Sequence, residues 1–220
     1  LESAHQRLRA SKFNPSPEQG YRLDAVLVGH SRLSMLFQEN PLPPDDPSNV
    51  LARTNKMFFK ELPDARKYWP FSDLVCSIEY LKTFEFFHYL SFEDKKALAR
   101  HVVAMSNYVT LAFFSIENGS NCTLHPDGTL PHDGKVPTEH AFEGQLHHGV
   151  IQLLRRLDMD KKEYVLLKAL IVCNPAIEDL SLSHKDKLED EREMYAKSLM
   201  SYVMWRRGPT KGPAAYTGIM

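Results

Sequence analysis

The residues best suited to specific chemistry are charged side chains that interrupt apolar helical stripes. Residues 79–100 read EYLKTFEFFHYLSFEDKKALAR, and Lys82 and Arg100 each lie on the apolar face of a predicted helix. Ser91 stands three residues before Asp94. This spacing predicts a capped helix start, because a side-chain oxygen accepts hydrogen bonds from the free N–H groups of the first turn. By residue type alone, Lys82 is better explained as a solvated lysine than as a binding residue.

The ten histidines form no pattern that predicts catalysis or a metal centre. His147 and His148 are adjacent, so on a helix they point ~100° apart and do not share a metal easily. His125, His132 and His140 lie in or near predicted loops with no fixed spacing. No Ser-His-Asp or Cys-His order and no Gly-rich phosphate loop stands out. We expect no cofactor, and an all-α enzyme with a histidine metal site is the alternative from another class.

Charge and cysteine content exclude several classes of function. The chain has 220 residues and a net charge of −1, which does not predict a surface that coats nucleic acid. Cys76, Cys122 and Cys173 form no CxxC pair, and their scatter is typical of a reducing compartment. We find no apolar run of the ~18 residues that a membrane span needs, and no signal peptide. A chain of this length can bury one sizeable core.

Hydrophobic periodicity predicts an almost entirely helical chain. Residues 1–16 are expected to form a tail and residues 17–220 the folded domain. Four prolines predict a loop at 40–49, and residues 121–132 predict a short hairpin. After His101, the helix predicted at 92–117 is nearly all apolar, which indicates a buried position. The predicted helices span residues 17–37, 50–60, 72–89, 92–117, 139–157, 161–173, 185–206 and 214–220.

The segment that contains Lys82 resembles the signature of nuclear-receptor ligand-binding domains. In that family the end of helix 3 carries a lysine, with an aromatic residue five positions on, a leucine eight on and an aspartate twelve on. Lys82, Phe87, Leu90 and Asp94 stand in this register without a gap, and Arg100 closes the pattern.

A second block, residues 153–180, is similar to helix 8 of the same family. The family's glutamate, its leucine stripe and the Asn-Pro that ends the helix correspond to Glu163, Leu167, Asn174 and Pro175. The two blocks occur in the family's order and spacing, and the resemblance covers roughly residues 65–220. The loose first third of the chain is typical of the divergent nematode branch.

The resemblance implies an all-α fold: a three-layer antiparallel helical sandwich of the nuclear-receptor ligand-binding type with one small β-hairpin. It implies a receptor that regulates transcription in the nucleus, not an enzyme and not a membrane protein. DNA binding through zinc is expected in a domain outside this chain, since the family's zinc module needs more cysteines than three. The family's C-terminal activation helix is not expected within these 220 residues, and the sequence does not decide whether one follows Met220.

The resemblance also implies a surface for a coactivator or corepressor helix with an LxxLL motif. Lys82 is expected to be accessible at the rim of this surface, where a cation contacts the partly negative C-terminal end of the bound helix. Phe87, Leu98, Arg100 and Val102 are expected to form the apolar groove beside it.

A lipophilic ligand needs a mostly apolar cavity with few polar groups. Helical phase and the family's fold predict its lining, although for any one of these residues a plain core position is the better supported interpretation. The candidates are Cys76, Glu79, Tyr80, Thr83, Met105, Tyr108, Ala112, Cys122, Leu124, Leu130 and Leu146, with Leu111, Phe114 and His147 as possible additions.

Two departures from the family pattern bear on the ligand. Many acid-binding members carry an arginine twenty residues after the aspartate, and the family has an acidic residue eleven after it. Here these positions are Phe114 and Met105. A buried carboxylate without a cationic partner is costly. We therefore expect a neutral, apolar ligand, or a small and empty cavity.

Asp94 and Glu163 are expected to be structural. A buried carboxylate must be paired, so Glu163 is expected to contact an arginine. The family's arginine near the final long helix appears here as Ala215, so the usual salt bridge is expected to be missing. The candidate partners of Glu163 are Arg100, Arg155 and Arg156.

A homodimer or heterodimer is expected to form through residues 185–206 and the helix that starts at Ala214. Leu199, Tyr202 and Trp205 make an apolar stripe on the first of these segments, and this stripe needs cover. The alternative within the family is a ligand-independent platform with a filled core, which binds only a dimer partner and coregulators.

Overall fold

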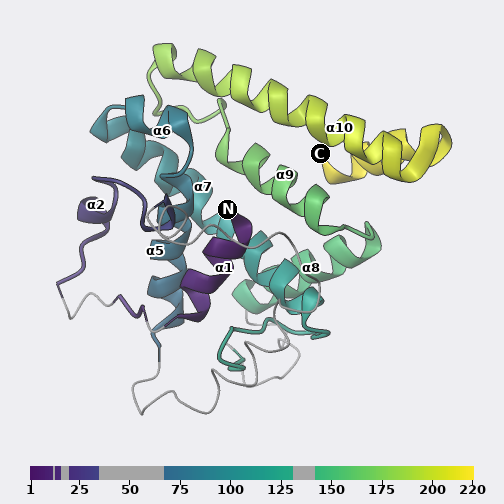
Figure 1. Ribbon diagram of the computed structural model, residues 1–220, viewed down its shortest axis with the longest axis horizontal. Coiled ribbons are helices and arrows are strands. Elements are labelled where there is room, and N and C mark those ends of the chain that lie inside the picture. Colours follow the sequence, from purple (N-terminus) through teal and green to yellow (C-terminus); the bar gives the residue numbers. More distant parts are fainter. Residues whose placement is uncertain (12, 16–19, 35–66, 131–141) are drawn as a thin grey trace. The chain divides into compact units, whose positions relative to one another are not determined.

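The computed structural model describes every residue except 12, 16–19, 35–66 and 131–141. The regular secondary structure of the described residues is entirely helical (Figure 1). An all-α fold class is therefore confirmed for this part of the chain, while the three-layer arrangement stays a prediction. The predicted helix at 50–60 and the predicted loop at 40–49 lie outside the described residues.

The chain divides into two compact units, which we describe separately. The first contains Leu1–Tyr89 and His125–Thr129, and the second contains Leu90–Leu124 and Leu130–Met220. None of the helices in the described ranges is both long and apolar enough to cross a membrane.

The first unit is organised around α5 (Trp69–Leu81), against which α1 (Glu2–Ala10) and α2 (Leu23–Val26) pack. The expectation of a tail is wrong for Glu2–Ala10, which form α1 instead. The buried face of α1 includes His5 and Arg9 beside Ala4 and Leu8. Because three of the five buried residues of α1 are polar (Glu2, His5 and Arg9), this face has no apolar stripe from which a helix is predicted.

The helix predicted at 17–37 is interrupted within the described residues 20–34. Residues 23–26 form α2 and residues 32–34 are helical, but residues 27–31 between them are not, and Gly29 there has a φ of +86°. An isolated short helix is marginal in water. The apolar stripe between Leu23 and Leu33 therefore does not by itself produce a long helix.

The long helix predicted at 72–89 is broken into α5 and α6 (Glu85–Tyr89). The break lies at residues 82–84, where the backbone N–H of Thr83 donates to the carbonyl of Tyr80 at 3.0 Å. The hydroxyl of Thr83 donates to the same carbonyl at 2.6 Å. A β-branched residue whose side chain competes for backbone partners favours a helix end.

The second unit contains α7 (Phe92–Glu117), α8 (Phe142–Arg156), α9 (Lys161–Val172) and α10 (Leu182–Ile219). Helix α7 packs against α8 and α9, and α9 packs against α10. The predicted bounds of α7 are confirmed, as is its cap: Ser91 Oγ accepts the N–H of Asp94 at 3.1 Å.

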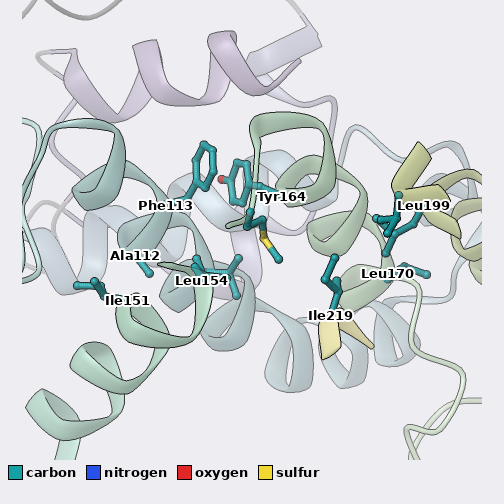
Figure 2. Packing of buried hydrophobic residues seen from close by; sticks show 11 residues of the cluster. Ala112, Phe113, Ile151, Leu154, Tyr164, Leu170, Leu199 and Ile219 are labelled. Atoms are coloured by element: carbon teal, nitrogen blue, oxygen red, sulfur yellow. The ribbon is translucent and has the colours of Figure 1, made fainter. Parts of the chain in front are cut away.

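The core of the second unit joins α7, α8, α9 and α10 (Figure 2). The rings of Phe113 on α7 and Tyr164 on α9 stack with centroids 4.1 Å apart. Ile151 and Leu154 come from α8, and Leu199 comes from α10. Each large apolar side chain buried in this way contributes about 1.5–3 kcal/mol to stability.

Helix α10 changes direction at Gly208, which has φ +72° and ψ 173°. The two helices predicted at 185–206 and 214–220 are thus one helix with a single kink, which continues through Pro209 and Pro213 to Ile219. Ile219 is buried and belongs to the core cluster of the second unit.

The predicted hairpin is absent from the described part of 121–132, and residues 131 and 132 lie outside it. Instead the chain makes a turn in which Gly128 N–H donates to His125 O at 2.9 Å and His125 N–H donates to Thr129 O at 3.0 Å. His125 stacks on Trp69 within the first unit, with ring centroids 4.7 Å apart. A ring stack and a tight turn therefore stand where the sequence suggested two strands.

Candidate functional site

Lys82 is buried, contrary to the expectation of an accessible rim residue. Its side chain is 3% exposed, and its Nζ lies 3.2 Å from Oε1 of Glu79, which is also 3% exposed. Helical spacing places the two residues three apart, so the ion pair forms across one turn. The carboxylate compensates the charge of the buried ammonium group. Lys82 is therefore not a solvated lysine on an exposed turn.

Glu79 also fixes the segment after α2 to α5. Its Oε2 accepts the backbone N–H of Arg32 at 2.7 Å, and its backbone carbonyl accepts the hydroxyl of Ser31. The guanidinium of Arg32 lies 3.9 Å from Oε1. Glu79 is therefore occupied by protein groups, which weighs against its predicted role as a ligand-binding residue.

The other predicted groove residues divide between the two units. Phe87 belongs to the first unit and is 1% exposed. Leu98, Arg100 and Val102 belong to α7 in the second unit, where the two apolar residues are buried and Arg100 is exposed. Their shared role as a coregulator groove stays a prediction.

A second buried ion pair, which the sequence analysis missed, joins α1 to α5. Nε of Arg9 donates to Oδ1 of Asp73 at 2.9 Å, and both side chains are 1% exposed. Nζ of Lys67 donates to the carbonyl of Arg9 at 2.7 Å, at the C-terminal end of α1. Burial lowers the pKa of Lys67 and raises the pKa of the nearby Cys76 thiol to about 12.

The raised pKa of the buried cysteines bears on the question of an enzyme. Cys76 stays a neutral thiol at physiological pH, and burial also raises the pKa of Cys173. Because the thiolate is the nucleophile and the metal ligand, neither cysteine is suited to either role. The described residues include no group of three or more metal-ligating side chains; His132 and His140 lie outside them.

Asp94, the signature aspartate, links the start of α7 to the start of α10. Its Oδ1 accepts the backbone N–H of Ser181 at 2.8 Å, and its Oδ2 accepts the hydroxyl of Ser91 at 2.7 Å. His184 Nδ1 lies 2.8 Å from Oδ2. Burial acts to raise the pKa of Asp94, but the hydrogen bonds from Ser181, Ser91 and His184 outweigh it and lower the pKa to about 2.

Ser181, His184 and Asp94 form a cluster that the sequence analysis did not find, but its geometry is not catalytic. Ser181 Oγ and Asp94 Oδ2 both lie 2.8 Å from the same atom, Nδ1 of His184. A catalytic triad places the serine and the aspartate on opposite ring nitrogens, so that the base receives one proton while it is oriented through the other. The cluster therefore holds two helix starts together.

Glu163 is fully buried and paired with arginine, as predicted, but its partners are Arg206 and Arg207. Nη1 of Arg206 donates to Oε2 of Glu163 at 3.0 Å, and Arg207 donates to both carboxylate oxygens, at 3.1 and 2.8 Å. The salt bridge that was expected to be missing is thus supplied by two arginines of α10 directly before its kink at Gly208. Arg155 instead contacts Asn121 and the carbonyl of Ser120.

Two further carboxylates complete this network. Arg206 contacts Oδ2 of Asp158 at 2.9 Å and Oδ2 of Asp160 at 3.2 Å. Burial acts to lower the pKa of Arg206, but Glu163, Asp160 and Asp158 outweigh it and raise the pKa. Asp160 also caps α9 and accepts the hydroxyl of Tyr202 at 2.6 Å, which raises the pKa of that phenol.

The predicted ligand-lining residues differ widely in exposure. Met105 is 47% exposed and Leu130 is 36% exposed, which contradicts an interior position for either side chain. The remaining candidates are buried or half-buried: Cys76, Glu79, Tyr80, Thr83, Tyr108, Ala112, Cys122, Leu124 and Leu146.

In the second unit, side chains from α7, from α8 and from the loop after α7 contact one another at one of these candidate residues, Tyr108. The ring of Tyr108 on α7 packs edge-on against the ring of His147 on α8, with centroids 4.7 Å apart. Nδ1 of His147 lies 3.1 Å from the hydroxyl of Thr123 in the loop after α7. His147 and Thr123 are 8% and 7% exposed. We call Tyr108, Thr123 and His147 the α7–α8 cluster.

Polar atoms next to this cluster in sequence have no hydrogen-bond partner among the described residues. They are Oδ1 of Asn107, Nδ1 of His148 and Oγ of Ser106. Leaving such a group buried and unpaired costs about 1–3 kcal/mol. Helical spacing alone gave no signal for this group, because polar residues on adjacent positions of a buried helix have no period.

Comparison of the sequence with known protein families identifies the class to which this chain belongs. The family model for the ligand-binding domain of nuclear hormone receptor matches residues 68–211, which include the Lys82–Asp94 segment and the Glu163 helix. The match covers more than half of the chain. This protein belongs to the nuclear hormone receptor ligand-binding domain family.

Its relatives include nematode receptors. Nuclear hormone receptor family member nhr-60 of Caenorhabditis elegans is 28% identical over 238 positions, which cover 100% of this chain and 50% of that protein. Members nhr-209 and nhr-136 of the same organism are 33% and 31% identical, over 68% and 66% of this chain and 37% and 34% of those proteins. The chain thus spans about half or less of the length of these relatives.

Proposed function

We propose that this chain is the ligand-binding and coregulator-binding domain of a nuclear receptor transcription factor that works in the nucleus. The observation that carries the proposal is the family match over residues 68–211, within which Asp94 links α7 to α10. DNA binding belongs to another part of the complete receptor. A homodimer or heterodimer partner and a lipophilic ligand complete the proposed set of partners.

The proposed mechanism is a shift between two placements of a C-terminal helix. A ligand, or a filled core, stabilises one placement, and the groove beside Lys82 then accepts or rejects a coregulator helix. Since Glu79 already pairs with Lys82 at 3.2 Å, the carbonyl groups at the end of the bound helix must compete with this carboxylate. The lysine therefore serves the coregulator only after its contact with Glu79 loosens.

Peptide binding tests the coregulator role. In the complete receptor, Lys82→Ala is expected to weaken binding of a fluorescent LxxLL peptide by about 1 kcal/mol, close to fivefold in Kd, because the helix-end contact is lost. Lys197→Ala, which removes a lysine of an exposed pair on α10, is the control. Equal affinity of the Lys82 variant and the wild type would remove Lys82 from this role.

A second function is favoured by the aromatic packing of the core. Phe114 is 2% exposed, and Phe113 stacks on the fully buried Tyr164. A core filled in this way suits a platform that binds partners without a ligand. Native mass spectrometry of the purified chain distinguishes the two functions, because a ligand-binding domain is expected to retain a lipid and a filled platform is not.

A further inference from the structure

Glu79 lies between two cationic side chains of the first unit and contacts only one of them closely. Its Oε1 lies 3.2 Å from Nζ of Lys82 and 3.9 Å from Nε of Arg32. The side chain of Lys82 is 3% exposed, whereas that of Arg32 is 51% exposed. Because the charge of one carboxylate balances only one of two cations, a closer contact with Arg32 weakens the hold of Glu79 on Lys82.

Backbone hydrogen bonds keep Arg32 beside this carboxylate. The N–H of Arg32 donates to Oε2 of Glu79 at 2.7 Å, and the hydroxyl of Ser31 donates to the backbone carbonyl of Glu79. The N–H of Leu33 donates to the same hydroxyl oxygen of Ser31 at 3.1 Å. The backbone of Arg32 therefore stays in place while its side chain changes rotamer, and the guanidinium has about 1 Å to travel before it forms a charge-assisted hydrogen bond with Oε1.

In the structure, two neutral rings hold the guanidinium of Arg32 away from the carboxylate. Its Nη2 donates to the hydroxyl of Tyr21 at 3.2 Å, and its Cζ lies 4.8 Å from the centroid of the Phe13 ring. Cation–π contacts at exposed sites are weak, and exposed side chains change rotamer within nanoseconds. Arg32 thus has two sets of partners within reach: the rings of Phe13 and Tyr21, and the carboxylate of Glu79.

We propose that Glu79 is an autoinhibitory lock on Lys82 and that Arg32 is the group that releases it. While Arg32 contacts Tyr21 and Phe13, Glu79 holds the ammonium of Lys82 in a buried position, away from a coregulator helix. When Arg32 moves onto the carboxylate, Lys82 loses its counter-charge, and a buried ammonium without one moves to solvent. The inference rests on the proposed coregulator-binding function and specifies how that site is regulated.

Two substitutions with opposite expected effects test the lock by fluorescence anisotropy of a labelled LxxLL peptide, titrated with the complete receptor. Glu79→Gln removes the charge that holds Lys82 but keeps an oxygen for the N–H of Arg32. It is expected to tighten peptide binding about fivefold, because the lysine becomes available to the end of the bound helix. Arg32→Ala removes the competitor for Glu79 and is expected to weaken peptide binding about twofold.

Matched variants separate the lock from effects of net charge and of folding. Glu85→Gln and Arg7→Ala make the same changes in charge at exposed residues of the first unit and are expected to bind the peptide as the wild type does. In a receptor that carries Lys82→Ala, neither test substitution is expected to change the affinity, because the lysine on which the lock acts is gone. If thermal melting shows that Glu79→Gln does not fold, Arg32→Ala with and without Lys82→Ala carries the test.

The outcomes distinguish this inference from the proposed function. If Lys82→Ala weakens peptide binding but the affinity stays unchanged in both Glu79→Gln and Arg32→Ala, the lock is wrong and the coregulator role of Lys82 stands. Equal effects of the test substitutions with and without Lys82→Ala would also overturn the lock alone, since they would reflect net charge. If the wild type binds no peptide, the proposed coregulator function fails together with the lock.

Discussion

Asp94 holds two helix starts with one carboxylate, and its low pKa makes that link sensitive to acid. The pKa is about 2 in the folded protein against an ordinary value of 3.8. A lowered folded-state pKa means that the stabilisation is complete above the ordinary value and is lost as the pH falls towards 2. The difference of nearly two pH units corresponds to about 2 kcal/mol.

We therefore predict that Asp94→Asn lowers the free energy of unfolding at pH 7 by about 2 kcal/mol, because the amide cannot accept all the hydrogen bonds of the carboxylate. The gap between variant and wild type is expected to narrow on going from pH 7 to pH 3. Urea unfolding at both pH values measures it. Asp190→Asn, at an exposed aspartate of α10, is the control; a gap independent of pH would contradict the assignment.

Glu163 is the second single residue with a measurable effect. Glu163→Gln keeps the cap of α9 but removes the charge that faces Arg206 and Arg207, whose side chains are 25% and 16% exposed. Breaking a buried pair costs about 3–5 kcal/mol, and partial exposure of the arginines reduces this to about 2–3 kcal/mol. Denaturant unfolding checks the value.

The matched control for Glu163 is Glu193→Gln, which breaks the exposed pair of Glu193 with Lys197. Such pairs contribute less than about 1 kcal/mol. Similar losses from the two substitutions would show that the Glu163 network is not specially stabilising.

At the residue scale, the Ser91 cap of α7 and the arginine pairing of Glu163 were predictable from the sequence. The cap follows from local spacing, and the pairing follows from the cost of an unpaired buried charge. It failed where the partner lies far along the chain. The pairing of Arg9 with Asp73 spans 64 residues, and that of Asp94 with Ser181 spans 87. Lys82 was misplaced since its burial depends on packing that no local pattern records.

At the scale of elements, the kink in α10 depends on one glycine. Gly208 has φ +72° and ψ 173°, a backbone region that residues with a Cβ rarely adopt. We predict that Gly208→Ala lowers the free energy of unfolding by about 1–3 kcal/mol through backbone strain alone, since a Cβ there meets no atom within 4 Å.

Gly149→Ala is the opposite control for the kink. Gly149 lies inside α8, and a Cβ there also meets nothing within 4 Å. Alanine in a helix interior is favoured over glycine by about 0.5–1 kcal/mol, so this variant is expected to be more stable than the wild type. Thermal unfolding of the two variants measures their Tm. If Tm shifted in the same direction in both, the result would contradict the proposed origin of the kink.

Helices with a strong cap or a continuous apolar face were predictable, and α7 and α9 agree with their expected bounds within one residue. Elements that depend on tertiary contact were not. Helix α1 buries His5 and Arg9, and the turn at His125 is held by Trp69, so neither has a local signature. The break at Thr83 was missed because apolar spacing continues across it.

At the scale of the whole molecule, the exposed apolar residues of α10 are the proposed dimer surface. The predicted stripe needs correction: Leu199 is fully buried in the core, whereas Trp205 is 77% exposed. Ile219, beyond the kink, is likewise buried, so the final segment contributes less to an outer surface than expected.

We predict that Trp205→Ser raises the Kd of the dimer at least tenfold and leaves Tm nearly unchanged, because an exposed aromatic side chain adds to an interface without supporting the fold. Sedimentation velocity over a range of concentrations measures the shift. Leu182→Ser, at an 80% exposed residue near the other end of α10, is the control. A wild type that stays monomeric at every concentration contradicts this surface.

The turn at His125–Thr129 belongs to the first unit, although the residues on either side of it belong to the second. The chain therefore crosses between the units three times, and no single cut in the backbone yields two separate pieces. On the ribosome, the first unit lacks a part until residue 129 has emerged, 40 residues after Tyr89. At about 5–20 residues per second this is a delay of about 2–8 s. The partly made receptor spends that interval with the ring of Trp69 uncovered by His125, exposed to chaperones.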